Sequence, residues 1–211
     1  MLTLTLIIVA ITCLVSFIAF SNGKLMEDLI FYPPAITNNN QWYRFITSGF
    51  IHADIQHLAF NMFTLYFFGR NWEFAYVGEL DVRATWYIIL YLGALVASQI
   101  PSYLKNKNNY RYSSLGASGA VSAVVFSNIL LMPWSTLYVF ILPVPAIIYA
   151  ILYLSYTIYM GKRGGDNVNH DAHLWGAIFG IAFSIALRPE VVGIFLQSMA
   201  HPHFNFSAPE Y

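Results

Sequence analysis

The sequence predicts an all-α polytopic membrane protein, a single domain over residues 1–211 that crosses the bilayer six times. Hydrophobic residues make up 58% of the chain and charged residues only 9%, whereas about a quarter of the residues of a soluble domain are charged. The apolar residues also gather in runs close to the roughly 20 residues that a membrane helix needs. Polar or turn-rich stretches separate these runs.

The charge pattern argues against a nucleic-acid partner. Ten basic residues balance ten acidic ones, and the basic residues are scattered over the expected loops rather than gathered in a stripe. The lone Cys13 lies inside an apolar run, so the sequence predicts no internal disulfide.

The first predicted span covers residues 4–20. No Lys or Arg precedes it and no clear small-residue cleavage site follows it, so we expect a retained span, with a signal peptide as the alternative. Residues 21–56 form a long connection rich in turn residues, but they also carry many aromatic rings. Trp and Tyr favour the membrane interface, which predicts that this first loop is partly embedded.

The next two spans are expected at residues 55–69 and 84–100, each followed by a polar loop. From Tyr112 to Gly161 the chain then has no charged residue over fifty positions. This run is too long for one crossing, so it must fold back.

The break is expected near Pro133, because proline removes a backbone donor and restricts the residue before it. Spans four and five then cover residues 112–132 and 137–160, and Pro143 and Pro145 should kink or loosen the first half of span five. Span six covers residues 172–187. The tail from Val191 to Ala200 is too short to cross again and is expected to rest on the membrane surface.

Counting spans places four reactive side chains near one membrane face. Spans two, four and six run in the same direction, and each carries its polar residues in its first turns: His57 and Asn61, Ser118, and His173. At 1.5 Å per residue these side chains lie at similar depth.

Ser118 and His173 form a candidate catalytic pair. A serine becomes a nucleophile when a base within hydrogen-bond reach takes its proton, and His173 is the obvious base. Gly176 and Gly180 follow the histidine at the spacing of a small-residue packing face. Spans four and six can therefore approach closely. Asp171 lies about 200° around the helix from His173, so a two-residue dyad is predicted.

Acyl transfer also needs donors that stabilise an oxyanion. The first backbone N–H groups of span four have no acceptor within the helix and lie at its positive end, which makes Gly116 and Ala117 candidates together with the Ser118 backbone. His57 and Asn61 share one face of span two and can both present N–H donors. The predicted oxyanion set is therefore His57, Asn61, Gly116 and Ala117, with Ser118.

Each of these residues alone has an ordinary structural interpretation, as a packing glycine, an interface histidine or an inter-helix hydrogen bond. A metal or haem site is the rival chemistry, with His52, His57, His170 and His173 as ligands. The chain lacks His-Glu-x-x-His, and no acid or Cys stands at ligand spacing from the pair at 170 and 173. We expect no metal and no cofactor.

Three motifs stand at these positions: Gly116-Ala117-Ser118-Gly119, Ala172-His173-x-x-Gly176-x-x-x-Gly180, and His57-x-x-x-Asn61. Together they resemble the rhomboid family of intramembrane serine proteases in its basic six-span form, and the similarity covers nearly the whole chain. The run from Trp42 through Arg44 to His57 resembles the family's first-loop region. Glu73 resembles the family's acidic residue just beyond span two.

The resemblance implies that Ser118 is the nucleophile and His173 the general base, with an oxyanion hole from His57, Asn61 and the Ser118 backbone. The first loop would be a half-embedded hairpin, and span five the movable side through which a substrate enters. The partners would be the lipid bilayer and a transmembrane helix of a membrane-protein substrate. The sequence indicates no oligomeric state.

Two residues depart from the family pattern. An aromatic residue commonly follows the nucleophile by four positions and packs on the histidine, but Ser122 stands there. Something else must hold the His173 ring. The family's Trp-Arg pair reads Tyr43-Arg44, with Trp42 one place early, which affects only packing of the first loop.

The resemblance implies a bacterial cytoplasmic membrane protein whose active site opens toward the non-cytoplasmic side. The positive-inside rule favours the reverse orientation, because the loops after spans one, three and five carry seven Lys or Arg against three elsewhere. We expect the family's orientation. The alternatives to a protease are a catalytically silent rhomboid-like protein that binds transmembrane segments or aids membrane-protein turnover, and a histidine-ligated electron carrier or transporter.

Overall fold

The computed structural model describes residues 3–139, 142–166 and 168–202, and helices dominate these ranges. The longer helices are α1 (Leu4–Ser21), α5 (Ile55–Trp72), α6 (Thr85–Asn106), α7 (Ser118–Leu131), α8 (Ala146–Arg163) and α9 (His170–Leu187). The first loop holds α2 (Gly23–Leu29), α3 (Pro33–Asn39), α4 (Arg44–Thr47) and the short 3₁₀ helix η1 (Ser48–Phe50). The remaining elements are the π-helical η2 (Glu73–Glu79), the hairpin β1 (Thr136–Val139) and β2 (Leu142–Pro145), and α10 (Val191–Ala200).

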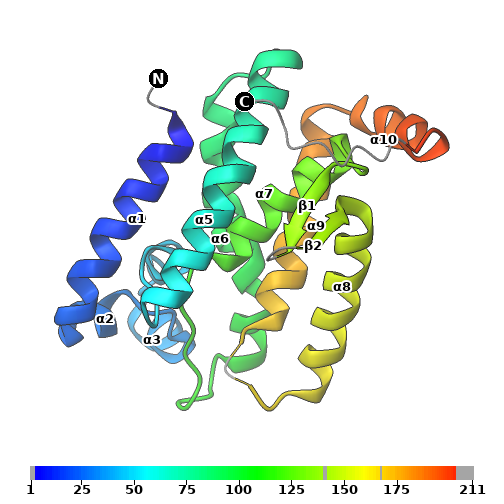
Figure 1. The fold of residues 1–211 in the computed structure, drawn as a ribbon. Helices are drawn as coiled ribbons and strands as arrows, with labels where there is room; N and C mark the ends of the chain where they lie inside the picture. Colours follow the sequence, from blue (N-terminus) through cyan, green and yellow to red (C-terminus); the bar gives the residue numbers. More distant parts are fainter. Residues whose placement is uncertain (1–2, 140–141, 167, 203–211) are drawn as a thin grey trace.

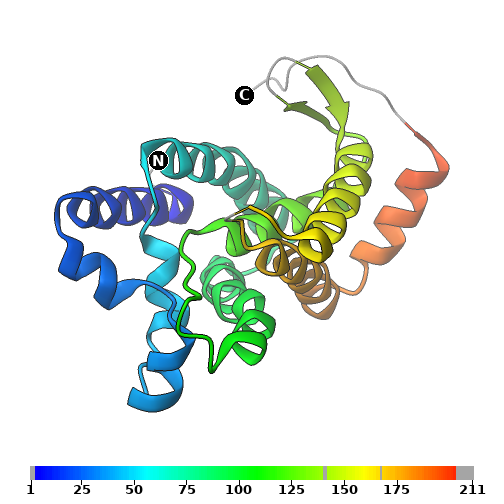
Figure 2. The ribbon, with the colours of Figure 1, turned by 90° about the horizontal axis from the view of Figure 1, so that it is seen from below.

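The helices form a bundle with α7 in its interior and α9 packed against it (Figure 1). α1 lies at one edge, and α8 and α10 lie at the opposite edge, as the view from below also shows (Figure 2). α5, α7 and α9 all begin at the same end of the bundle, the end at which α2 and α3 lie (Figure 1). The shared direction predicted from the span count is confirmed.

Two of the described helices, α1 and α6, are long and apolar enough to cross a membrane by length and composition. The number becomes three if α9 and α10, which meet at 111°, are taken as one bent span. The outer face of α1 carries exposed apolar side chains, among them Leu14 at 62% exposure, as lipid contact requires. The all-α membrane architecture is confirmed, whereas the count of six spans stays a prediction.

Span four was predicted to start at residue 112, but α7 starts at Ser118. The chain before it is extended, and Ser114 pairs with Phe31 of the first loop through two backbone hydrogen bonds. Gly116 follows with a φ of 112°, a conformation that suits glycine. α7 therefore begins only after this turn, at Ser118.

Span five was also predicted too long at its first end. Residues 136–139 and 142–145 pair as the antiparallel strands β1 and β2, and α8 starts at Ala146. Pro143 and Pro145 both lie in β2, where proline is tolerated because each strand of a two-stranded hairpin has a free edge. The loosening expected from these prolines is confirmed, and it takes the form of a separate hairpin.

Two predicted loops begin as helix instead. α5 continues into the π-helical turn η2 over residues 73–79, where the loop after span two was expected. α6 runs on through Pro101 to Asn106. Proline removes one helical hydrogen bond, but Ser102 and Asn106 beyond it are buried, so packing keeps this last stretch helical.

Arg44 organises the first loop. Its side chain is 6% exposed, and Nη1 donates to the carbonyls of Glu27 and Ile30 at 2.7 Å each. Trp42 stacks on Phe45 with ring centroids 6.1 Å apart. Arg44 and Trp42, which stand where the sequence departs from the family's Trp-Arg pair, therefore contribute to the packing of this loop.

α7 and α9 pack backbone to backbone. A Cβ atom on Gly176 would overlap the carbonyl of Gly119, and one on Gly180 would overlap the carbonyl of Ala123. The small-residue face predicted for span six is confirmed. Deeper in the bundle the hydroxyls of Ser127 and Ser184 share a hydrogen bond of 2.6 Å, and such interhelical bonds add to association within a membrane.

Candidate functional site

One cavity of about 460 Å³ brings the predicted reactive residues together. His57 and Asn61 of α5, Ser118 of α7 and His173 of α9 all line it. Its other walls come from the first loop, from the extended chain before α7, from α8 and from the chain just before α9, so widely separated parts of the sequence surround it. The four side chains that the span count placed at similar depth share one site.

Ser118 stands at the first position of α7, and its side chain is partly exposed in the cavity. At this position the backbone N–H has no intrahelical acceptor and lies at the positive end of the helix dipole. Within the described residues, the Ser118 hydroxyl is not hydrogen bonded to the His173 ring. Such bonds are often long before substrate binds and tighten in the reacting complex.

Aromatic contacts hold the His173 ring. The ring of Tyr153 on α8 stacks on it, with centroids 6.1 Å apart and planes inclined by 23°. The hydroxyl of Tyr153 is hydrogen bonded to Ser122 Oγ at 2.8 Å. His170 meets the edge of the same imidazole, with centroids 6.0 Å apart and planes at 79°. Tyr153 was not among the residues predicted from the sequence, although its spacing to Tyr149 marks an aromatic face on that helix.

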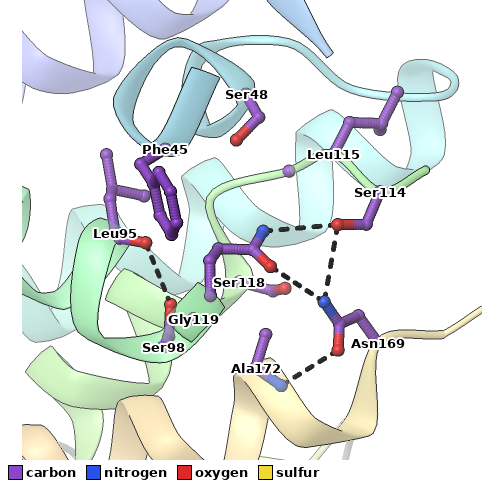
Figure 3. A pocket seen from close by; sticks show the side chains of 12 residues that line it. Phe45, Ser48, Leu95, Ser98, Ser114, Leu115, Ser118, Gly119, Asn169 and Ala172 are labelled. Atoms are coloured by element: carbon purple, nitrogen blue, oxygen red, sulfur yellow. Dashed lines mark hydrogen bonds between the residues drawn. The ribbon is translucent and has the colours of Figure 1, made fainter. Parts of the chain in front are cut away.

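Asn169 fixes the beginning of α9 (Figure 3). Its Oδ1 accepts from the Ala172 N–H at 3.1 Å and from the Ser102 hydroxyl at 3.0 Å. Its Nδ2 donates to Gln99 Oε1 at 3.0 Å and to Ser114 Oγ at 3.4 Å. One side chain thus connects α6, the chain before α7 and the first turn of α9, which carries His173.

A second, much smaller cavity of about 10 Å³ is lined by residues of this network. Ser118, Gly119 and Ser98 line it together with Asn169, and Figure 3 shows these side chains around it. This volume is close to the minimum that a water molecule occupies. Polar side chains of Ser98, Gln99 and Asn169 therefore lie beside Ser118 although α6 and α7 are mostly apolar.

The turn before Ser118 is built from buried hydrogen bonds. Gly116 N–H donates to the Ser48 carbonyl at 2.9 Å, and Ala117 N–H donates to His52 Nε2 at 3.3 Å. The other ring nitrogen of His52 is bonded to Ser16 Oγ at 3.0 Å. Burial lowers the pKa of His52 to about 3, so the ring stays neutral and can accept from Ala117.

The structure therefore separates the predicted oxyanion donors into two groups. The amides of Gly116 and Ala117 donate to Ser48 and His52 of the first loop, and neither residue lines the large cavity. A Cβ on Gly116 would lie 2.9 Å from His57 Nε2, so this glycine lets the His57 ring approach the chain beside Ser118. Asn61 is only 4% exposed, and its Nδ2 donates to the His57 carbonyl at 3.0 Å.

His52 and His170, the other two histidines near the cavity, have protein partners. His170 Nε2 donates to Asp166 Oδ2 at 3.0 Å, and the His52 ring packs edge-on against His57 with centroids 5.0 Å apart. Within the described ranges no three His, Cys, Asp or Glu side chains are grouped as a metal site would require.

Apolar helices packed through glycines, with a serine and a histidine meeting at one interior cavity, define a helical membrane protein with a polar site buried in its bundle. The Rhomboid domain matches residues 39–190 of the chain. The chain therefore belongs to the rhomboid family.

Three relatives illustrate the similarity. RHOMBOID-like protein 12, mitochondrial, from Arabidopsis thaliana is 35% identical over 144 residues, which is 63% of this chain and 42% of that protein. Rhomboid-like protein 11, chloroplastic, from the same plant is 37% identical over 66% of this chain and 50% of its own length. Rhomboid protease AarA from Providencia stuartii is 29% identical over 88% of this chain and 72% of its own length. The chain thus matches half or less of the two plant proteins.

Membership of this family makes the chain an integral membrane protein. The predicted bacterial cytoplasmic membrane is not supported, because the two plant relatives are named as mitochondrial and chloroplastic.

Proposed function

We propose that the chain is an intramembrane serine endopeptidase that cleaves transmembrane segments of membrane proteins. One observation carries this proposal: Ser118, His173, His57 and Asn61 come from three helices and line one cavity. Two bacterial relatives are named as proteases, AarA from Providencia stuartii and GluP from Bacillus subtilis, the latter 25% identical over 85% of this chain. The names agree with the chemistry that these side chains can perform.

In the proposed reaction Ser118 Oγ attacks the carbonyl carbon of the scissile peptide bond while His173 takes the hydroxyl proton. The tetrahedral intermediate then collapses, the C–N bond breaks, and His173 returns the proton to the leaving amine. A water molecule next attacks the acyl-serine ester and gives its proton to His173. The ester bond breaks, Ser118 regains its proton, and the second product leaves as a carboxylic acid.

The developing oxyanion would be stabilised by the free N–H of Ser118, the His57 ring and the Asn61 side chain. Donors that are fixed before the reaction are the most effective, and all three lie on the walls of the cavity. In this proposal Gly116 and Ala117 support the same site indirectly, because their hydrogen bonds to Ser48 and His52 hold the turn that presents Ser118.

The cavity also suits an apolar substrate. Val121, Phe126 and Tyr149 also line it, so side chains of a transmembrane segment can leave lipid for apolar surroundings. The lipid bilayer and a transmembrane helix are the partners that this implies. We place the mouth of the site on the non-cytoplasmic side, and a reporter fused to the C-terminus that is found outside the cytoplasm would contradict that orientation.

The test is cleavage of a reporter transmembrane substrate by the reconstituted protein. Ser118→Ala and His173→Ala should each abolish cleavage. Ser113→Ala, in the wall of the same cavity, and His201→Ala, which is exposed, serve as matched controls and should cleave normally. Covalent labelling of Ser118 by a serine-directed phosphonate checks nucleophile activation separately. Undiminished cleavage in either dyad variant would refute the mechanism.

A catalytically silent rhomboid-like protein that binds transmembrane segments is the second candidate. The observation that favours it is the lack of a hydrogen bond between Ser118 and His173 within the described residues. A silent protein would bind a transmembrane segment equally well with and without Ser118, and the phosphonate would not label it. The presence of both dyad residues at one cavity favours the protease.

A further inference from the structure

Tyr153 connects three helices at the candidate site. It projects from α8, its ring stacks on His173 of α9 at 6.1 Å, and its hydroxyl is bonded to Ser122 of α7 at 2.8 Å. Ser122 lies one turn after Ser118, so the nucleophile and the anchor of the tyrosine occupy the same face of α7. A single side chain of α8 thus touches both helices that carry the dyad.

The tyrosine ring is also held from its other sides. Tyr149, one turn earlier on α8, stacks with it at 5.5 Å and 26°. Phe126 of α7 lies 5.7 Å away at 45°. The aromatic neighbours therefore restrict rotation of the Tyr153 ring, and the hydrogen bond of its hydroxyl to Ser122 restricts its movement along the helix axis. The ring thus presents a fixed flat face to the imidazole of His173.

We propose that Tyr153 is the positioning residue of His173, and that Ser122 in turn positions Tyr153. This inference rests on the proposed protease function. A general base works only within hydrogen-bond reach of the proton it takes, and a ring stacked on the imidazole limits its rotation. The orientation of the base then depends on where α8 stands relative to α7.

His170 does not replace this support. It touches the edge of the His173 ring and is bonded to Asp166, but it stands on the same helix as His173. It moves together with the imidazole and therefore does not fix the position of the imidazole relative to α7. The hydrogen bond between Tyr153 and Ser122 does fix it, because Ser122 belongs to α7.

The experiment compares four changes with the wild-type protein in the same membrane preparation. Tyr153→Leu removes the ring, Tyr153→Phe keeps the ring and removes the hydroxyl, and Ser122→Ala removes the partner of that hydroxyl. The fourth change exchanges the two residues, Ser122→Tyr with Tyr153→Ser, and is compared with Tyr153→Ser alone. Tyr159→Leu is the matched control, because Tyr159 is an exposed tyrosine on the same helix.

Cleavage is measured as kcat and KM separately, with the rate at which the phosphonate labels Ser118 as a second readout. Tyr153→Leu should lower kcat on the order of tenfold to a hundredfold, the cost of a misplaced catalytic group, with KM nearly unchanged. Tyr153→Phe and Ser122→Ala should each cost about fivefold, and their combination no more than either alone, since both remove one hydrogen bond. The exchange should recover part of the activity that Tyr153→Ser loses.

A folded Tyr153→Leu protein with wild-type kcat would overturn the positioning role, as would a loss expressed only in KM. If the leucine variant does not fold, Tyr153→Phe and the exchange test the positioning role instead, because both keep an aromatic ring at the site. Ser118→Ala is measured in parallel. Cleavage that survives it refutes the protease itself, whereas cleavage that needs Ser118 and ignores Tyr153 refutes only the positioning role.

Discussion

Gly176 of α9 lies directly against the backbone carbonyl of Gly119 in α7. The contact is one residue from Ser118 and three residues from His173, so it sets how closely the two candidate catalytic side chains approach. No side chain intervenes between the helices at this level. The spacing of the dyad is therefore a property of backbone packing.

Gly176→Ala should push the two helices apart. The added carbon meets backbone rather than a movable side chain, so we expect a loss of about 1 to 3 kcal/mol in the free energy of unfolding, as for overpacked cores. Cleavage should fall further than stability alone explains, because Ser118 and His173 separate. Unfolding in detergent and cleavage of the reporter substrate measure the two effects.

Gly193→Ala is the matched control for that change. Gly193 lies in α10, and nothing stands within 4 Å of the position that its Cβ would take. Alanine there should leave cleavage unchanged and stabilise the helix by about 0.5 to 1 kcal/mol. Equal behaviour of the two variants would contradict the close packing of α7 and α9.

His57→Ala and Asn61→Ala test the proposed oxyanion donors. Removing one such donor typically lowers kcat by about a hundredfold to a thousandfold, and we expect each variant to fall in that range with a smaller change in KM. Thr64→Val is the control, because Thr64 lines the same cavity while its hydroxyl donates to the Phe60 carbonyl of its own helix. If neither variant loses kcat, the oxyanion must be stabilised elsewhere.

Glu73→Gln should loosen the start of α1. The Glu73 carboxylate accepts from the N–H of Leu4 at 2.8 Å and from the hydroxyl of Thr5 at 2.7 Å, and a negative charge is favoured at a helix N-terminus. Hydrogen bonds to a charged group contribute about 1.5 to 3 kcal/mol, and we expect a loss of that order. Glu79→Gln, at an exposed site nearby, should cost much less. The free energy of unfolding in detergent, measured for both variants and for the wild type, checks this difference.

The loop before α9 should contribute a pH-dependent term to stability. The hydrogen bond from His170 holds the pKa of the Asp166 carboxyl below its ordinary value of 3.8. A depressed pKa means that the ionised form stabilises the fold above the unfolded value, and that this contribution is lost as the pH falls through the lower folded value. Asp166→Asn should therefore be less stable than wild type above pH 3.8.

The difference should vanish at lower pH, where wild-type Asp166 is protonated as well. Thermal unfolding across the acidic range measures it, with Asp28→Asn as an exposed control. A pH profile of Asp166→Asn parallel to that of wild type would show that the bond to His170 contributes nothing.

The sequence was sufficient for those features that follow from regular periodicity. The apolar runs located the long helices, the span count gave α5, α7 and α9 a common direction, and the spacing of Gly176 and Gly180 located the packing face of α9. Each of these rests on a repeat within one segment. The meeting of Ser118, His173, His57 and Asn61 at one cavity then follows from direction and depth.

Features that depend on contacts between distant segments could not be predicted in the same way. The start of α7 at Ser118 depends on the turn at Gly116 and on pairing of Ser114 with Phe31. The support of the His173 ring comes from Tyr153, twenty residues away on another helix. A tyrosine in an apolar run looks the same whether it faces lipid or a catalytic histidine, so the spacing of Tyr149 and Tyr153 indicates an aromatic face but not what that face contacts.

The length of α7 has a consequence for the proposed substrate. Its 14 residues span about 21 Å at 1.5 Å per residue, whereas the hydrocarbon layer is about 30 Å thick. With the far end of α7 at one surface of that layer, Ser118 lies about 9 Å below the other surface. An extended chain covers about 3.3 Å per residue, so roughly three residues of a transmembrane helix must unwind below the membrane surface before the scissile bond reaches the serine.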